Sequence, residues 1–281
     1  MKKEFVAAVC SLLLIVGAAA LLQAQLAAPT AAGVSLGAVY YTVPDVAAHK
    51  KIWVEIFGAK PVMVGKTEML KIPGAFIVLT KGEPAAGNPL INHFGIWAKD
   101  LDPTRAKLTA AGIQTAPKAQ FIDLPNALRL EFIDDPAGPG APAAHHIHYF
   151  VANQQDGLAA RAWYMKTFGA TENARRNGGV PSALLTTPDK WISVDFTAAG
   201  GRGRGGATAA PPPPAPASNK GTILDRFALE VKGIEAFVKR IEGEGVKISK
   251  PVSTNADGLK TAMIVDSLGN DVELIEGLAG K

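Results

Sequence analysis

The chain repeats one arrangement of apolar and polar positions four times. In each repeat a short strand with alternating apolar residues precedes a helical segment that glycine terminates. The strands open at residues 38, 93, 146 and 226, and the helical segments span residues 47–57, 103–111, 158–168 and 234–244. Further strands close each repeat, so the pattern predicts four βαβββ units in two consecutive pairs.

The closing strands give the clearest match between repeats. Residues 121–131 parallel residues 264–273 with one residue inserted, and each segment ends at a glutamate, Glu131 or Glu273. These two carboxylates are therefore expected at equivalent places in their units.

Two segments interrupt the repeats. A Pro/Gly-rich stretch at 134–142 is typical of a linker, and residues 200–220 combine Gly-Arg repeats with four consecutive prolines. We therefore expect a flexible segment at 25–34, a first domain at 35–135, a linker at 136–143 and a second domain at 144–279. The second domain carries the segment 200–220 as a disordered or polyproline insertion.

The N-terminus has the pattern of an export signal. Lys2 and Lys3 precede an apolar run that reaches Leu22, and Leu22-Gln23-Ala24 is a suitable cleavage site. Residues 1–24 are therefore predicted to direct the protein to the periplasm or the medium. An uncleaved segment would instead act as an anchor, the one membrane contact that the sequence indicates.

Composition restricts the chemistry of the exported chain. The formal charge of +4 becomes +3 when Lys2, Lys3 and Glu4 are removed, and no Lys/Arg run interleaves with aromatic residues. Nucleic-acid binding is therefore not expected. The single cysteine, Cys10, lies in the export segment, so any metal must be held by histidines and carboxylates.

Three features together resemble the vicinal oxygen chelate superfamily, which includes glyoxalases, bleomycin-resistance proteins and extradiol dioxygenases. They are the strand openings, the helix end at 163–169 and the segment 265–274. That segment is similar to the family's Asp-Pro-x-Gly-Asn-x-x-Glu-Leu signature, with Ser267 in place of proline. The resemblance implies an α+β fold of two tandem domains, each with two βαβββ units that form a half-open barrel.

Strand alternation predicts which side chains line each cavity. With Ile147 and Tyr149 packed under a helix, His146 and His148 face the concave side, whereas His145 faces the other way. The same alternation places His93 and Trp97 on the concave side of the first domain, where Trp97 is the best candidate to stack on a ligand.

The resemblance places metal ligands at the strand openings and on the closing strands. The first domain then offers only two ligands, His93 and Glu131, beside Ala38 and Val78. The second offers His146, Asp195 and Glu273, with His148 one pleat further along and Arg226 at the fourth place.

Arg226 allows two interpretations of the second domain, because a guanidinium cannot ligate a metal. In one, His146, Glu273 and either Asp195 or His148 hold the metal, and Arg226 binds an anionic substrate. In the other, Arg226 pairs with the carboxylates and takes the place of the metal. His148 and Arg226 are the candidate catalytic residues.

The resemblance implies a metal-dependent lyase, isomerase or dioxygenase that uses Fe, Mn, Zn or Ni on a small oxygenated molecule. The alternative is a metal-free protein that binds a small molecule, as bleomycin-resistance proteins do. Under either interpretation we expect a monomer or a homodimer. The sequence leaves open whether strands exchange between the domains, in which case His93 and Glu131 would gain ligands from elsewhere.

Overall fold

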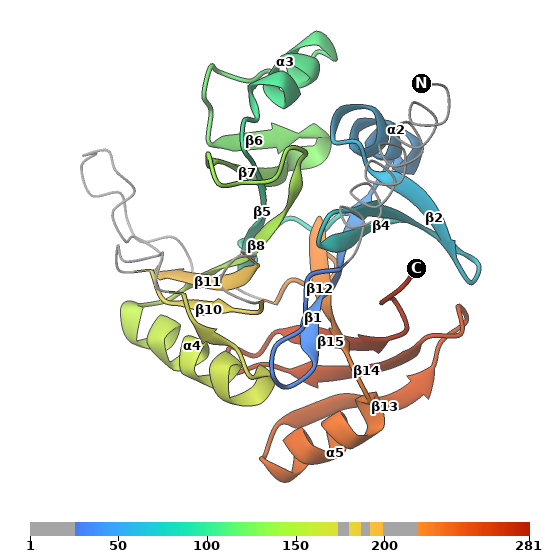
Figure 1. Ribbon diagram of the computed structural model, residues 1–281, viewed down its shortest axis with the longest axis vertical. Helices are drawn as coiled ribbons and strands as arrows, with labels where there is room; N and C mark the ends of the chain where they lie inside the picture. The colour runs from blue at the N-terminus through green and yellow to red at the C-terminus, as the bar shows by residue number, and fades with distance from the viewer. Residues whose placement is uncertain (1–25, 174–179, 187–191, 199–217) are drawn as a thin grey trace, which may run out of the picture.

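The strands form two mixed sheets, shown in a computed structural model in Figure 1. The structure describes residues 26–173, 180–186, 192–198 and 218–281. The export segment at 1–24 and most of the insertion at 200–220 lie outside these ranges, so both stay predictions.

Four consecutive units supply the strands and helices, as the repeats predicted. Unit 1 has β1 (Val34–Val43), α2 (Val46–Lys51), the π-helical turn η1 (Ile52–Ile56), β2 (Lys60–Val64), β3 (Thr67–Ile72) and β4 (Ala75–Lys81). Unit 2 has β5 (Ile91–Ala98), α3 (Asp102–Ala110), β6 (Phe121–Leu124), the 3-10 turn η2 (Pro125–Ala127) and β7 (Leu128–Asp134). Unit 3 has β8 (Ala143–Val151), α4 (Gln154–Phe168), β9 (Thr171–Glu172), β10 (Ser182–Leu184) and β11 (Ser193–Ala198). Unit 4 has β12 (Leu224–Val231), α5 (Ile234–Gly243), β13 (Lys247–Thr254), β14 (Lys260–Val265) and β15 (Asp271–Glu276).

Unit 2 differs from the predicted βαβββ pattern, because only two strands follow its helix. The segment between α3 and β6 contains Pro117, which lacks an N–H for a strand ladder. Lys118, the next residue, has a φ of 55°, a left-handed conformation that a strand excludes.

Local chemistry explains where the helices begin and end. The Asp45 side chain accepts a hydrogen bond from the backbone N–H of Ala48, and Asn153 accepts one from Asp156. The predicted stop at Gly169 is confirmed, since this residue ends α4 with a φ of 64°, which glycine adopts without strain.

The sheets do not follow the order of the units along the chain. Units 1 and 4 form an eight-stranded sheet in the order β13-β14-β15-β12-β1-β4-β3-β2. Units 2 and 3 form a seven-stranded sheet in the order β6-β7-β5-β8-β11-β10-β9. We call them the arginine sheet and the histidine sheet, after Arg226 on β12 and the histidines on β5 and β8.

The sheets pair the units differently from the expected consecutive pairs, whereas the domain boundaries 35–135 and 144–279 stay a prediction. The predicted linker at 136–143 joins β7 to β8 within the histidine sheet, so it does not separate two sheets. Each predicted domain instead contributes one unit to each sheet. The physical reason is that the opening strands pair across the chain, β1 with β12 and β5 with β8, both antiparallel.

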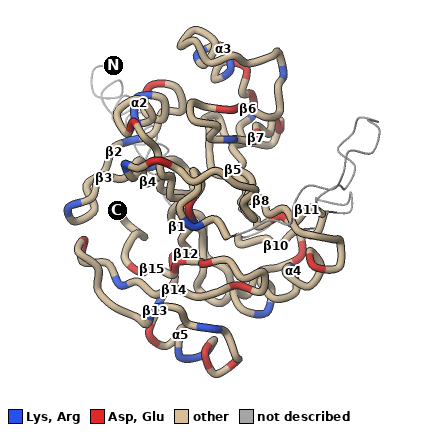
Figure 2. The backbone as a smooth tube through the Cα atoms, turned by 180° about the vertical axis from the view of Figure 1, so that it is seen from behind, with Lys and Arg blue, Asp and Glu red and all other residues tan. Residues whose placement is uncertain are grey.

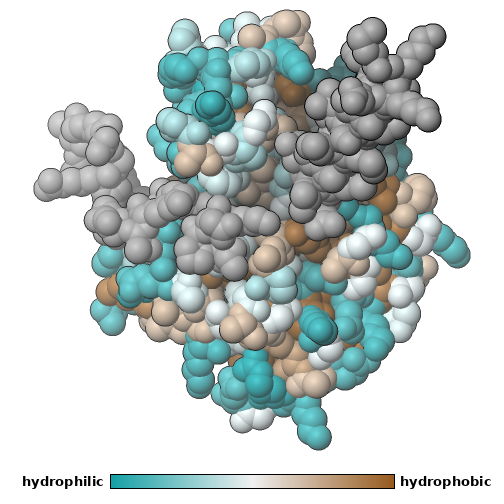
Figure 3. All heavy atoms as spheres, viewed as in Figure 1, coloured by the Kyte–Doolittle hydropathy of each residue, from teal (hydrophilic) through white to brown (hydrophobic). Residues whose placement is uncertain are grey.

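One face of each sheet packs beneath the helices in a continuous core. Aromatic side chains from the helices fill it, among them Trp53, Tyr164, Phe168 and Phe237. Hydrophilic side chains cover much of the outer surface in Figure 3, and Figure 2 shows lysine and arginine interspersed with aspartate and glutamate. Among the described residues, no helix has the length and apolar character that a membrane crossing requires.

A buried polar cluster around Asp266 joins the two sheets. Asp266 lies in the turn after β14 of the arginine sheet, and its Oδ2 accepts hydrogen bonds from the hydroxyls of Tyr149 and Tyr164, both at 3.0 Å. Its Oδ1 accepts from the backbone N–H groups of Leu268 and Asn270, both at 2.9 Å. Burial raises the pKa of the Asp266 carboxyl, although these hydrogen bonds oppose the shift.

The Asp266→Ala variant should therefore lose much of the stability of the fold. The substitution leaves two hydroxyls and two N–H groups buried without their acceptor, so we expect the free energy of unfolding to fall by about 3 kcal/mol or more. Asp266→Asn keeps one acceptor oxygen and should lose less. Urea unfolding of the three proteins measures this, and a loss below about 0.5 kcal/mol in Asp266→Ala would contradict it.

Candidate metal centre

Four ligand atoms from three neighbouring strands converge on the concave side of the histidine sheet. They belong to His93 on β5, Glu131 on β7, and His146 and His148 on β8, and all lie within 4.8 Å of one another. Glu131 Oε2 is 2.8 Å from His93 Nε2 and 3.0 Å from His146 Nε2. All four residues are buried.

The remaining distances place His148 slightly further out. Its Nδ1 is 3.4 Å from His146 Nε2 and 3.9 Å from Glu131 Oε2, whereas the Nε2 atoms of His93 and His146 are 3.3 Å apart. The cluster therefore has a close set of three residues and a fourth at its edge.

Two β-bulges aim His93 of β5 and His146 of β8 into the cluster. The register between β5 and β8 slips by one residue at Asn92 and again at His145, immediately before His93 and His146. A bulge breaks strict alternation and redirects side chains. His145 therefore does not face the other side of the strand as predicted; it lies beside His146, with their Nδ1 atoms 2.6 Å apart.

Gly95 leaves the space that the His146 ring occupies. Gly95 and His146 are register partners on β5 and β8, and a Cβ added at residue 95 would lie 2.1 Å from His146 Nδ1. Any side chain at this position would displace the imidazole.

Three of the four residues also contact a further polar side chain through the nitrogen or oxygen that faces away from the cluster. Such outer hydrogen bonds are common around metal ligands in proteins. Asn92 Oδ1 lies 2.9 Å from His93 Nδ1, and Thr197 Oγ1 lies 2.7 Å from His148 Nε2. Gln120 donates to Glu131 Oε1 at 2.6 Å. Sequence reasoning missed these three residues, although Asn92 directly precedes a predicted ligand.

Burial and hydrogen bonding put the donors into the protonation states that a metal needs. Burial lowers the pKa of His93, despite the opposing hydrogen bond to Glu131, and lowers the pKa of His148 well below its usual value. Burial alone would raise the pKa of Glu131, but the hydrogen bonds from His146 and His93 outweigh it and hold this pKa well below the ordinary range. The cluster thus combines an ionised carboxylate with two imidazoles, those of His93 and His148, that resist protonation.

The predicted ligand Asp195 lies beside the cluster but contributes none of its four converging atoms. It is the register partner of His148 on β11, and its Oδ1 accepts hydrogen bonds from the hydroxyls of Ser182 and Ser193. These bonds engage one of its two carboxylate oxygens.

The arginine sheet repeats the same backbone geometry with other side chains. Its register slips at Gly37 and at Asp225, immediately before Ala38 and Arg226. Matching register positions then pair the two sheets residue for residue: Arg226 with His93, Ala38 with His146, Tyr40 with His148, Glu273 with Glu131 and Val78 with Asp195.

Arg226 occupies the position that corresponds to a ligand and pairs with the carboxylates around it. Its Nε is 2.9 Å from Glu273 Oε2, its Nη1 is 2.6 Å from Asp225 Oδ2, and its guanidinium stacks on the Tyr40 ring at 3.9 Å. Ala38, Tyr40 and Val78 belong to an apolar cluster on this concave face. This agrees with the interpretation in which Arg226 stands where a metal would be.

The structure thus regroups the predicted site residues. His93 and Glu131, expected to form an incomplete site, are completed by His146 and His148 from the other predicted domain. Arg226 and Glu273, expected beside His146, lie in the arginine sheet instead. The cause is the pairing of β5 with β8, which joins units that the consecutive grouping had separated.

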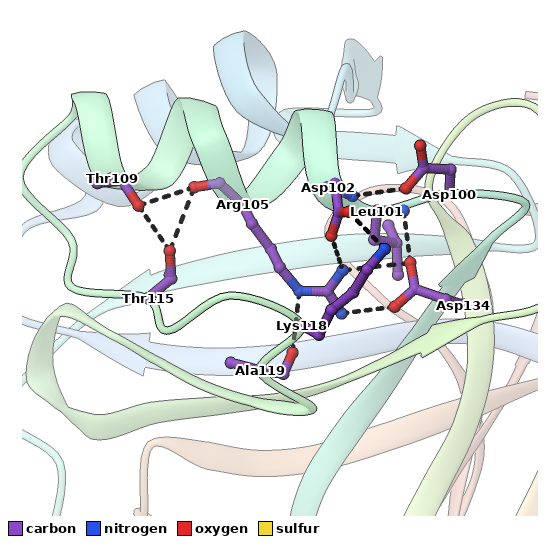
Figure 4. A network of polar contacts seen from close by, with 9 residues as sticks. All are labelled: Asp100, Leu101, Asp102, Arg105, Thr109, Thr115, Lys118, Ala119 and Asp134. Carbon is purple, nitrogen blue, oxygen red and sulfur yellow. Dashed lines mark hydrogen bonds and ion pairs between the residues drawn. The ribbon is translucent and has the colours of Figure 1, made fainter.

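A second acidic group, Asp100, Asp102 and Asp134, also brings carboxylates together, but cations already neutralise it. Figure 4 shows Arg105 pointing from α3 between these side chains, with hydrogen bonds to Asp102 and Asp134. Lys118 pairs with Asp102 as well. This cluster ties α3 to the end of β7 and does not have the donor set of a metal site.

Comparisons with known proteins agree with this geometry. Residues 144–274 match the family model of the Glyoxalase/Bleomycin resistance protein/Dioxygenase superfamily. The fold is similar to that of glyoxalase I from Zea mays (17% identity, 86% of this chain and 92% of that chain, TM-score 0.61). It is also similar to a putative dioxygenase from Bacillus subtilis (12% identity, 90% of this chain and 88% of that chain, TM-score 0.60). No curated protein sequence matches the chain.

The Gly95→Ala variant tests the packing of His146. Because the new methyl group would overlap the ring, we expect the free energy of unfolding to fall by about 1–3 kcal/mol. Gly243→Ala is the matched control, since Gly243 lies in α5 and an added Cβ would meet nothing within 4 Å. Urea unfolding should show the control unchanged or slightly stabilised; equal stabilities for both variants would contradict the assignment.

Proposed function

We propose that the chain is a metal-dependent enzyme of the glyoxalase or dioxygenase type, since residues 144–274 match the model of the Glyoxalase/Bleomycin resistance protein/Dioxygenase superfamily. It would act as a lyase, isomerase or dioxygenase on a small molecule with two adjacent oxygens. The observation that carries this proposal is the buried cluster of His93, Glu131, His146 and His148.

The donor atoms of this cluster fit one divalent metal ion. Ligands about 2.1 Å from a tetrahedral ion lie about 3.4 Å from each other, and the interatomic distances given above run from 2.8 to 3.9 Å. Three imidazole nitrogens and one carboxylate oxygen suit Zn(II), Fe(II), Mn(II) or Ni(II). Among the residues that the structure describes, no guanidinium or ammonium pairs with the ligand atoms, in contrast to the arginine sheet, where Arg226 pairs with Glu273.

When bound, a metal would supply a Lewis acid that polarises the substrate oxygens and stabilises an oxyanion. The chain's own residues hold and protect that centre. His93, Glu131 and His146 form the close set of ligands, and Gln120 and Asn92 keep two of them in orientation. Burial of the cluster excludes bulk water, which strengthens every electrostatic interaction inside it.

His148 is suited to move a proton at the edge of the cluster. It is the most distant of the four residues from Glu131, and burial keeps its imidazole unprotonated near neutral pH. Thr197 holds its Nε2, which leaves Nδ1 facing the other ligands and the substrate position. A neutral imidazole held in this way is a general base. The Nδ1 lone pair of His148 would therefore either complete the ligand set or accept a proton from the substrate, but not both at once.

The aromatic neighbours of the cluster favour a substrate with an apolar part. The ring of Phe121 lies 5.3 Å from that of His93, and the ring of Phe150 lies 5.8 Å from that of His148. Phe121 is 49% exposed, so it presents its ring at the rim of the site. Arg226 lies in the other sheet and takes no part in this chemistry.

Metal analysis tests the proposal. Purified protein incubated separately with Zn(II), Fe(II), Mn(II) and Ni(II) and then desalted should retain about one equivalent of at least one metal. Glu131→Gln should weaken binding by more than about 100-fold, because it removes a ligand and not only an outer contact. Glu273→Gln, at the corresponding position of the arginine sheet, should bind as the wild type does.

Two outcomes would overturn the metal assignment: no stoichiometric binding of any of the four ions, or a loss in Glu273→Gln equal to that in Glu131→Gln. The loaded protein should then be assayed on a hemithioacetal and on a catechol, which represent the two activities in the family description. His148→Gln should bind metal with at most a modest loss and turn over slowly.

We also propose that the enzyme acts outside the cytoplasm, in the periplasm or the medium. The support is the pattern of residues 1–24, with its basic start, apolar run and small residues near position 24. N-terminal sequencing of the protein expressed from its full gene should show a chain that begins near residue 25. An intact Met1 in a cytoplasmic fraction would contradict export.

A further inference from the structure

His145 is a fourth histidine at the cluster, and it contributes none of the converging ligand atoms. It is 1% exposed, and its ring packs near that of Trp97, with centroids 5.6 Å apart. Its Nδ1 lies 2.6 Å from Nδ1 of His146, the ring atom on the far side from Glu131. Two imidazoles at this distance share a single hydrogen.

The corresponding bulge on β5 shows the same contact with a different residue. There Asn92 precedes His93, and its Oδ1 lies 2.9 Å from His93 Nδ1. Both bulges therefore turn two successive side chains to one face, so that the first holds the second. The repetition at two independent positions indicates that the contact serves the histidine that follows.

The shared hydrogen links the orientation of His145 to the use of His146. In the structure His146 Nε2 is 3.0 Å from Glu131 Oε2, so Nε2–H donates to the carboxylate and Nδ1 accepts from Nδ1–H of His145. A metal on Nε2 of His146 requires the hydrogen on Nδ1 instead, and His145 Nδ1 must then accept it. An imidazole can take either role by carrying its own proton on Nδ1 or on Nε2.

We infer that His145 is a positioning residue for His146, which holds its ring and its tautomer so that the Nε2 lone pair can face a metal. The inference rests on the proposed metal site, and it assigns His145 a role that neither strand alternation nor the ligand set predicts. When Nε2 of His146 loses its proton to solvent, the shared hydrogen passes from His145 to His146, and Nε2 of His145 takes up one proton from solvent. The number of protons on the pair is then unchanged.

Nitrogen NMR of the side chains tests the pairing in the metal-free protein. The chain has only five histidines, so their imidazole signals can be assigned by substitution. His146 should be protonated at Nε2 and His145 at Nδ1, and both should change to the other tautomer when Zn(II) is added. A His146 protonated at Nδ1, or a His145 protonated at Nε2, in the metal-free wild type would overturn the inference.

Metal affinity supplies the second readout. His145→Leu should weaken Zn(II) binding by about 10–100-fold, as loss of an outer hydrogen bond to a ligand does. His145→Asn should retain affinity within a few-fold, because asparagine already fills this role at residue 92, and Asn92→Leu should lose affinity as His145→Leu does. Urea unfolding of each metal-free variant verifies that it is folded.

The possible outcomes separate the two proposals. If the wild type binds no metal, the proposed function fails, while the tautomers of the metal-free protein still decide whether the two rings are paired. If the wild type binds one equivalent and His145→Leu binds as tightly, the positioning role of His145 is wrong and the metal site stands.

Discussion

The site depends on one pairing, that of β5 with β8. This antiparallel ladder brings the second and third units into one sheet, and thereby places His93 opposite His148 and Gly95 opposite His146. The two slips in its register set the histidines on one face, and the missing side chain at Gly95 makes room for them. Without this ladder, the buried Glu131 carboxylate would lose His146 and His148 and keep only His93 and Gln120 of its own unit as partners.

Local features of the fold were predictable because neighbouring residues determine them. The helix ends at Gly58, Gly112 and Gly169 and the alternation in the opening strands follow from backbone preference and burial, and both appear in the structure. The choice of partner strand was not predictable, because it depends on contacts between residues more than 50 positions apart. His93 and Glu131 were therefore identified individually and placed in an incomplete site. His145 was misplaced for a different reason: strict alternation contains no bulge, and nothing in the residue types alone indicates one.

The two sheets show how one backbone frame can hold two different charge arrangements. Glu131 and Glu273 occupy matching positions, and both need a positive or hydrogen-bonding partner in a buried place. In the histidine sheet three imidazoles are the partners of the carboxylate, and an imidazole also has a nitrogen lone pair that can bind a metal. In the arginine sheet a guanidinium takes this role permanently, since Arg226 cannot lose its charge or ligate a metal. The difference in chemistry between the halves thus comes from few side chains, and the strands and bulges are common to both.

The strand β8 serves both sheets at once. Its His146 and His148 side chains point into the cluster. The next residue, Tyr149, points the other way, and its hydroxyl donates a hydrogen bond to Asp266 of the arginine sheet. One backbone segment therefore carries two histidines of the cluster and a contact that joins the two sheets. Loss of the Asp266 contact would loosen the strand on which His146 and His148 lie. The arginine sheet thus helps to position the histidine cluster, although it contributes none of the four converging atoms.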